Sequence, residues 1–333
     1  MAGSVQERFE ALVLHGERHE APEYFQQLSK QFAGGLWHDY QRLLEGLPGP
    51  LRGLDVVDLG CKYGHMLVYF LAAGARSGVG VDVEPDYVEA GNRVLGSFDE
   101  SLSLVQSQGG WLPLPPESAD LVFVNEVISH VNPTFLDTLY AEVARVLRPG
   151  GWVLVSDGNN LASLSCRKAL LDVYDAWENG PPGRQTDRDV VTRPFVEIRH
   201  ALLADWLPEL PAERLEHLAR NTSGLFGEEL RAVGERYAKT GQLVERPYRR
   251  GQCPTNPLPA GVVMERGFYP EQVVLALRAL GFDARELTER IRERRPGWRN
   301  RLRDALGTLR HEARRRLGGD PGWNFRVLGV RSR

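Results

Sequence analysis

Apolar and polar positions follow two different patterns along the chain. Between residues 51 and 157, short apolar runs of strand length recur at 55–59, 79–83, 102–105, 120–124 and 152–155. Stretches with helical spacing separate them, at 64–73, 86–95 and 133–147. Continuous apolar runs are typical of strands buried on both faces, and strands that alternate with helices form a parallel sheet covered by helices. Right-handed crossovers then predict a doubly wound, Rossmann-like α/β sheet.

A different pattern flanks this region. Residues 1–50 have helical spacing and end at Pro48-Gly49-Pro50. Residues 158–267 show no strand alternation and predict helices at 163–177, 196–206, 211–220 and 225–240. The α/β pattern returns with a helix at 270–280 and strands at 282–287 and 325–331, around an Arg-rich helical insert at 289–318.

We therefore predict four regions. They are an N-terminal helical segment (1–50), a cofactor-binding core (51–157), a helical insertion after the fifth strand (158–267) and the completion of the core (268–333).

Composition and charge exclude some classes of protein. The 42% hydrophobic and 26% charged residues are ordinary for a globular chain, and a net charge of -3 gives no overall attraction to nucleic acid or membrane. The cysteines Cys61, Cys166 and Cys253 are far apart, which predicts neither disulfides nor a metal site and favours a cytoplasmic protein. No apolar run is long enough to predict a membrane span, and the N-terminus lacks the apolar stretch of a signal peptide.

The first strand ends in a sequence that suits ligand binding, Asp58-Leu59-Gly60-Cys61-Lys62-Tyr63-Gly64. Glycine allows the backbone to approach a ligand closely, and the start of a helix supplies free N–H groups for an anionic group such as a carboxylate. Asp58 suits a cation such as an ammonium group. Asp82 ends the second strand, where a carboxylate can accept hydrogen bonds from both hydroxyls of a ribose.

Four segments, in order, resemble the class I S-adenosylmethionine-dependent methyltransferase family. Asp58 to Gly64, followed by Asp82, resembles the family's D/E-x-G-x-G-x-G motif and its acidic partner. The other three segments are LPLPPESADLV (112–122), VISHV (127–131) and EVARVLRPGG (142–151). The resemblance covers 51–157 well, 262–331 loosely and 158–261 not at all. It implies a seven-stranded sheet whose last strand is antiparallel, S-adenosylmethionine as cofactor, and methyl transfer as the activity.

The resemblance also implies roles for individual residues. Gly60 and Gly64 pass under the methionine moiety, Asp58 lies near its ammonium, Asp82 holds the ribose and Val83 touches the adenine. Gln108 takes the place of an Asp that accepts from the adenine amino group. The full predicted cofactor set is Asp58, Gly60, Cys61, Gly64, Asp82, Val83, Gln108, Gly109, Trp111 and Asn125. His130, Glu126 and Asp157 are the catalytic candidates, with no metal. Lys62 departs from the motif, which usually has glycine there.

The methyl acceptor is left open by the sequence. We expect oxygen or nitrogen of a small molecule, such as a natural product or a sugar, with the insertion 158–267 as a lid. Methylation of nucleic acid through the Arg-rich insert is an alternative, which Asn125-Glu126-Val127-Ile128 disfavours because base methylases carry prolines there. A nicotinamide dehydrogenase would need G-x-G-x-x-G, which is absent. A catalytically idle nucleotide-binding protein and a homodimer both remain open.

Overall fold

The computed structural model describes residues 36–287, apart from 97, 188 and 189, and residues 321–332, with a few isolated residues before 36. The Arg-rich insert predicted at 289–318 and most of the helical segment predicted before residue 36 lie outside these residues. Within the described part of the chain, no helix is both long and apolar enough to cross a membrane.

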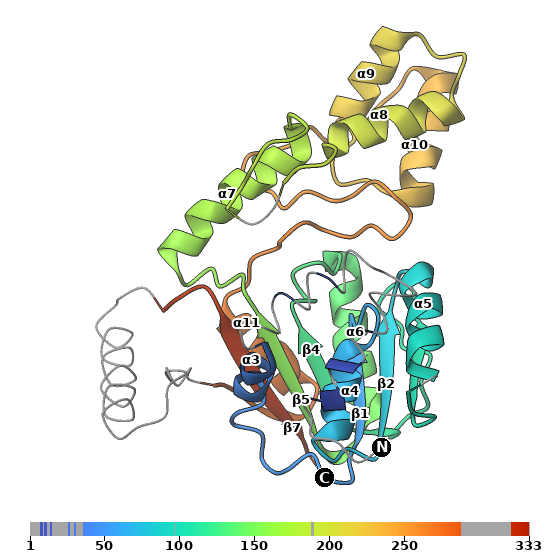
Figure 1. Cartoon of the computed structure of the whole chain (residues 1–333). Coiled ribbons are helices and arrows are strands. Elements are labelled where there is room, and N and C mark those ends of the chain that lie inside the picture. The colour runs from blue at the N-terminus through green and yellow to red at the C-terminus, as the bar shows by residue number, and fades with distance from the viewer. Residues whose placement is uncertain are drawn as a thin grey trace.

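A seven-stranded sheet forms the centre of the molecule, with strand order β3-β2-β1-β4-β5-β7-β6 (Figure 1). The strands are β1 (Asp55–Leu59), β2 (Ser77–Asp82), β3 (Leu102–Gln106), β4 (Ala119–Asn125), β5 (Leu147–Asp157), β6 (Phe282–Glu286) and β7 (Phe325–Arg331). The first five strands are parallel, and β7 runs antiparallel to both β5 and β6. The predicted doubly wound sheet with an antiparallel last strand is therefore confirmed.

Helices cover both faces of the sheet. They are α3 (Leu36–Leu43), α4 (His65–Ala72), α5 (Pro85–Gly96), α6 (Pro133–Val146) and α11 (Pro270–Ala279). Alternation along β1 divides the core: Val57 and Leu59 pack with side chains of α6 and α11, whereas Val56 packs with those of α4 and α5. Burial of apolar side chains on both faces explains why the strands are continuously apolar.

Strand β5 differs from its prediction. The sequence predicts a helix to residue 147 and a strand at 152–155, yet β5 begins at Leu147. Leu147 pairs with Ala119, and Trp152 pairs with Leu121, so the intervening residues form a bulge within the strand. The bulge is held by Arg148, which lies 2.8 Å from Asp120 and 3.0 Å from Asp55. These ion pairs connect β5 to the first residues of β1 and β4.

The insertion after β5 folds into helices near the predicted positions: α7 (Leu164–Asn179), α8 (Phe195–Trp206), α9 (Ala212–Arg220) and α10 (Gly227–Thr240). Helix α7 leads away from the carboxyl end of β5, and α8 to α10 form a lobe beyond it (Figure 1). The lobe has its own apolar clusters, one around Trp177 and Phe195 and one around Leu203 and Leu218. The chain then returns to the sheet through an extended segment, residues 241–269, which we call the return segment.

Candidate active site

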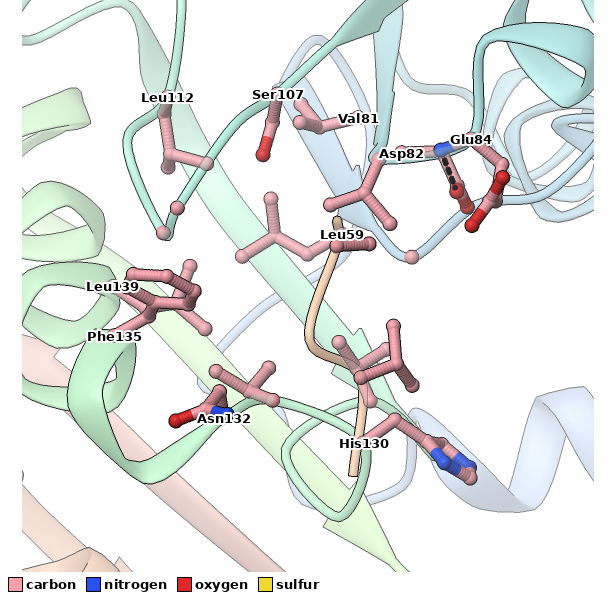
Figure 2. A pocket seen from close by; sticks show the side chains of 18 of the residues that line it. Leu59, Val81, Asp82, Glu84, Ser107, Leu112, His130, Asn132, Phe135 and Leu139 are labelled. Carbon is pink, nitrogen blue, oxygen red and sulfur yellow. Dashed lines mark hydrogen bonds between the residues drawn. The ribbon is translucent and has the colours of Figure 1, made fainter. Parts of the chain in front are cut away.

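A cavity of about 290 Å³ lies at the carboxyl ends of the parallel strands. Loops after β1, β2, β3 and β4, the start of α6 and the return segment all contribute to its wall. In Figure 2, Ser107, Leu112 and Asp82 line one side, and Asn132 and His130 the other. Ligands of open α/β sheets bind at this edge.

The loop after β1 has three residues in the left-handed region, Gly60 (φ 66), Lys62 (φ 49) and Gly64 (φ 76). A Cβ at Gly60 would lie 2.4 Å from Cγ2 of Val127, and one at Gly64 would lie 2.6 Å from Cδ1 of Leu95. Both positions therefore require glycine for space as well as for conformation. Lys62 stands where the motif usually has glycine, and it has left-handed φ although this is unfavourable for a residue with a side chain.

Asp82 joins this loop to the end of β2. Its side chain is 8% exposed and lines the cavity. Oδ2 accepts a hydrogen bond from the backbone N of Lys62 at 2.8 Å, and Oδ1 accepts one from the N of Glu84 at 3.1 Å. Each carboxylate oxygen has lone pairs left for further donors. The carboxylate is thus fixed in orientation and can still accept two hydroxyl groups from the cavity.

Asp58 lies behind the loop rather than in the cavity wall. It is 4% exposed, and no other described residue donates a hydrogen bond to its side chain. Burial, and then the neighbouring charge of Asp82, raise its pKa well above the usual range. Asp58 and Asp82 are therefore neighbours at one edge of the sheet, and a nearby cation would stabilise the ionised form of Asp58.

A second polar group surrounds His130, at the other side of the cavity. The Nδ1 of His130 lies 3.2 Å from the carbonyl oxygen of Val263, so Nδ1 is the donor. The Nε2 faces Oε1 of Glu265 at 4.0 Å. Glu265 Oε2 in turn accepts from Nδ2 of Asn159 at 2.5 Å. Glu265 was not predicted as a site residue, because it is far from His130 in the sequence and the return segment brings the two together.

Glu126 and Glu265 share an unusual backbone, with φ values of 55 and 58. Glutamate rarely adopts this conformation, and such residues concentrate at functional sites. Glu126 lines the cavity, and its Oε2 accepts from the backbone N of Gly158 at 3.2 Å.

Asp157 does not reach the cavity, although it was predicted as a catalytic candidate. It is fully buried, and its oxygens accept from the backbone N of Ser129 and of Asn159, both at 3.1 Å. Burial, and then the charge of Glu126, raise its pKa to about 7. In this position Asp157 holds the loop after β4 in place and cannot touch an acceptor.

The structure thus brings only part of the predicted set together. Six predicted residues line the cavity: Gly60, Asp82, Val83, Gly109, Glu126 and His130. Seven do not, namely Asp58, Cys61, Gly64, Gln108, Trp111, Asn125 and Asp157.

The residues outside the cavity have other places in the fold. Cys61 is buried and packs closely over Gly80. Strand β3 extends to Gln106, and a tight turn follows in which the N of Trp111 donates to the carbonyl of Gln108 at 3.0 Å. This turn leaves Gln108 exposed, and Trp111 is 54% exposed. Ser107 lines the cavity where Gln108 was expected.

Other lining residues were missed, among them Tyr87, Leu112, Phe135, Leu139, Ala260 and Val262. Leu112 begins the predicted 112–122 segment, but the other side chains resemble ordinary core positions, so the sequence offers no signal for them.

Comparison with known proteins identifies the core. A family model described as a methyltransferase domain matches residues 57–155. A fatty-acid O-methyltransferase of Mycolicibacterium smegmatis is 30% identical over 195 residues, which are 52% of this chain and 66% of that protein. A ribosomal protein L11 methyltransferase of Sorangium cellulosum is 28% identical and covers 34% of each chain. The chain thus spans about two thirds of the first relative and about a third of the second.

The solved structures that match this chain are distant from it. An S-adenosylmethionine-dependent methyltransferase from Mesorhizobium loti is 17% identical, with a TM-score of 0.43 over 88% of this chain and 97% of that one. A phosphoethanolamine N-methyltransferase 2 from Haemonchus contortus, solved with S-adenosyl-L-methionine, is 14% identical, with a TM-score of 0.44 over 89% of this chain and 53% of that one.

The fold and the matched domain define a Rossmann-like methyltransferase core. The chain belongs to the class I S-adenosylmethionine-dependent methyltransferases through this domain. S-adenosylmethionine is the cofactor of that family, as the resemblance implied.

Proposed function

We propose that the protein transfers a methyl group from S-adenosylmethionine to an oxygen or nitrogen atom of a small molecule bound in the cavity. The observation that carries this proposal is the fixed carboxylate of Asp82, which lines the cavity beside the glycine loop. The bound cofactor supplies an activated methyl group, so the protein must mainly orient the acceptor and exclude water.

The residues present fit this cofactor. Asp82 would accept hydrogen bonds from the ribose hydroxyls, and Val83 and Leu112 would contact the adenine. Gly60 would allow close approach of the methionine moiety. Asp58 is a buried carboxylate in need of a cation, which the ammonium group of the cofactor would supply.

His130 is the proposed general base for a hydroxyl or an ammonium acceptor. Its Nδ1 donates to Val263, which leaves the lone pair of Nε2 free to take a proton. The carboxylate of Glu265, 4.0 Å from Nε2, would stabilise the imidazolium that forms. A carboxylate acceptor is already ionised and would need no base.

Oxygen is the favoured acceptor atom, since the first relative is named a fatty-acid O-methyltransferase. Natural products and sugars remain within the proposed class. The insertion would act as the lid: Ala260 and Val262 of the return segment line the cavity. The three free cysteines support a cytoplasmic location.

Calorimetry with S-adenosylhomocysteine, the product cofactor, tests the proposal. The wild-type protein should bind it, and Asp82→Ala should weaken binding by roughly 10- to 100-fold, because charge-assisted hydrogen bonds are worth about 1.5–3 kcal/mol each. Glu89→Ala is the matched control, since Glu89 is an exposed carboxylate on α5 paired with Arg93. An equal loss in both variants, or no binding by the wild type, would overturn the assignment. Binding without turnover on acids, alcohols and amines would favour an idle binding protein.

A further inference from the structure

A second cavity lies between the core and the insertion. It measures about 680 Å³, which is within the range of small-molecule sites. The start of α6 forms one side, and the loop before α10 and the return segment form the other. We call it the groove. The proposed function assigns no ligand to it.

The groove carries an excess of positive charge. Three arginines line it, Arg246, Arg249 and Arg266, against two carboxylates. Glu229 lies 3.5 Å from Arg246, and Glu245 lies 3.6 Å from His217 outside the groove. Among the described residues, no carboxylate lies within ion-pair distance of Arg249 or Arg266. Two cationic side chains therefore face the groove without a counter-charge.

Two buried polar atoms at the groove have no hydrogen-bond partner among the described residues. One is Nη1 of Arg266, and the other is Oγ of Ser223, a residue only 4% exposed. The guanidinium of Arg266 is held over the ring of Phe268, at 5.0 Å from the ring centre to Cζ. Buried polar groups are nearly always paired, and leaving a charged one unpaired is costly. An anion in the groove could supply the acceptor that these donors lack.

The start of α6 adds to the attraction for an anion. This helix has 14 residues, and Pro133 and Thr134 of its first turn line the groove. The N-terminus of a helix carries partial positive charge.

The groove adjoins the active-site cavity. Asn132 lines both, and its Nδ2 donates to the carbonyl of Gly261 at 3.0 Å. In the return segment, Val262 lines the active-site cavity and the next residue, Val263, lines the groove. A ligand in the groove would therefore lie next to the place where the methyl acceptor reacts.

We propose that the groove binds an anionic group of the methyl acceptor, a carboxylate or a phosphate monoester, through Arg266, Arg249 and Ser223. This group is separate from the atom that is methylated. The inference rests on the proposed function, because it assumes that an acceptor occupies the neighbouring cavity.

Calorimetry on the full chain saturated with S-adenosylhomocysteine tests the inference. The probes are hexanoate, hexyl phosphate, hexanol and inorganic phosphate. One of the two anionic hexyl probes should bind at least tenfold more tightly than hexanol, and Arg266→Met should remove at least tenfold of that affinity. Arg231→Met is the matched control, since Arg231 is an exposed arginine of the insertion paired with Glu235. The affinity for S-adenosylhomocysteine should change less than twofold in both variants.

Two further variants keep the inference testable if Arg266→Met fails to fold. Arg249→Met changes an exposed side chain, and Ser223→Ala removes only the unpartnered oxygen, so both should fold and still weaken the anionic probe by threefold or more. Equal binding of hexanol and the anionic probes, or unchanged binding in all three groove variants, would overturn the inference. If inorganic phosphate bound as tightly as hexyl phosphate, the groove would be a site for a free anion. That result would overturn the proposal that it binds a group of the methyl acceptor. If the wild type did not bind S-adenosylhomocysteine, the result would instead contradict the proposed function.

Discussion

Single residues in the left-handed region shape the loop after β1. Gly64 has φ 76, and any Cβ there meets Cδ1 of Leu95 and of Leu104 at 2.6 and 2.8 Å. Lys62 shares the sign of φ but is exposed. The two positions therefore differ mainly in the space around them, and less in their backbone conformation.

We predict that Gly64→Ala lowers the free energy of unfolding by about 1–3 kcal/mol, because the added methyl overpacks the core and strains the backbone. Lys62→Gly should change it by less than about 1 kcal/mol, since relief of strain is offset by the flexibility of glycine in the unfolded chain. Urea denaturation measures both. Equal losses would show that the closeness of Leu95 and Leu104 is unimportant.

His130 carries the proposed proton transfer. With an alcohol acceptor, His130→Ala should lower kcat by roughly 10²- to 10⁴-fold, the usual contribution of a general base. Glu265→Gln should have a smaller effect, because Glu265 acts through His130. Affinity for S-adenosylhomocysteine serves as the control and should be unchanged in both. Unaltered kcat in His130→Ala would remove His130 from the mechanism.

The raised pKa of Asp157 predicts that the stability of the protein depends on pH. Its pKa is raised from 3.8 to about 7 by burial. Between these values the folded state keeps a proton that the unfolded state has lost, so this residue's contribution to stability falls as pH rises from about 4 to 7. In Asp157→Asn that loss is absent, so the variant's stability relative to wild type should improve across this range.

Urea denaturation at several pH values between 4 and 8 checks this. Asp137→Asn, an exposed position on α6, is the control and should follow the wild type. At pH 4 the Asp157→Asn variant should be less stable than the wild type. One of the two backbone N–H donors would then face the amide nitrogen, which cannot accept a hydrogen bond. Parallel curves for Asp157→Asn and wild type would contradict the raised pKa.

The elements of the fold were largely predictable from the sequence. The strands of the core are short and apolar, and glycine or proline marks their ends, so their number and order along the chain could be predicted. The bulge in β5 could not, because it depends on Leu147 pairing with Ala119 of another strand. The site was only partly predictable. Asp82 follows from strand position, whereas Ser107 and Glu265 depend on turn geometry and on the return segment.

Helices α7 and α8 are joined by an ion pair that the periodicity did not reveal. Arg199 and Glu178 are 0% and 1% exposed, and Nε of Arg199 also donates to the carbonyl of Ala219 at 2.9 Å. The charges satisfy each other within the apolar lobe. Removal of one partner leaves the other charge buried alone.

We predict that Arg199→Met lowers the free energy of unfolding by about 3–5 kcal/mol. The double variant Arg199→Met/Glu178→Leu should recover most of the loss, because apolar side chains can replace a buried pair. Arg220→Met is the control, since the Arg220–Glu216 pair is exposed and worth less than about 1 kcal/mol. A double variant as unstable as Arg199→Met would show that the pair has no apolar substitute.

In the whole molecule, the core and the insertion meet at the candidate active site. The backbone N of Val263 donates to the carbonyl of His130 at 3.0 Å, and that of Arg266 donates to Ser129 at 2.8 Å. Ligand contacts with Ala260 and Val262 would therefore stabilise hydrogen bonds between the two parts.

We predict that S-adenosylhomocysteine slows amide hydrogen exchange at Val263 and Arg266 and leaves the amides of α9 unchanged. At 100 times the Kd the protection is limited to about 2.7 kcal/mol. Mass spectrometry of exchanged peptides measures it. Equal protection of the α9 amides would mean that the lobe and the core respond as one unit. If neither α9 nor the two return-segment amides were protected, cofactor binding would not stabilise the return segment.

The position of β7 has a consequence for how the protein is made. Among the strands that the structure describes, β6 pairs only with β7, and β7 joins it to β5. Yet β7 follows the other six strands of this sheet in the sequence, so a ribosome that has translated β6 has not yet made its partner. During synthesis the five parallel strands can assemble while the edge of β5 stays open. During that interval the unpaired edge of β5 can pair with a strand of another chain, which favours aggregation.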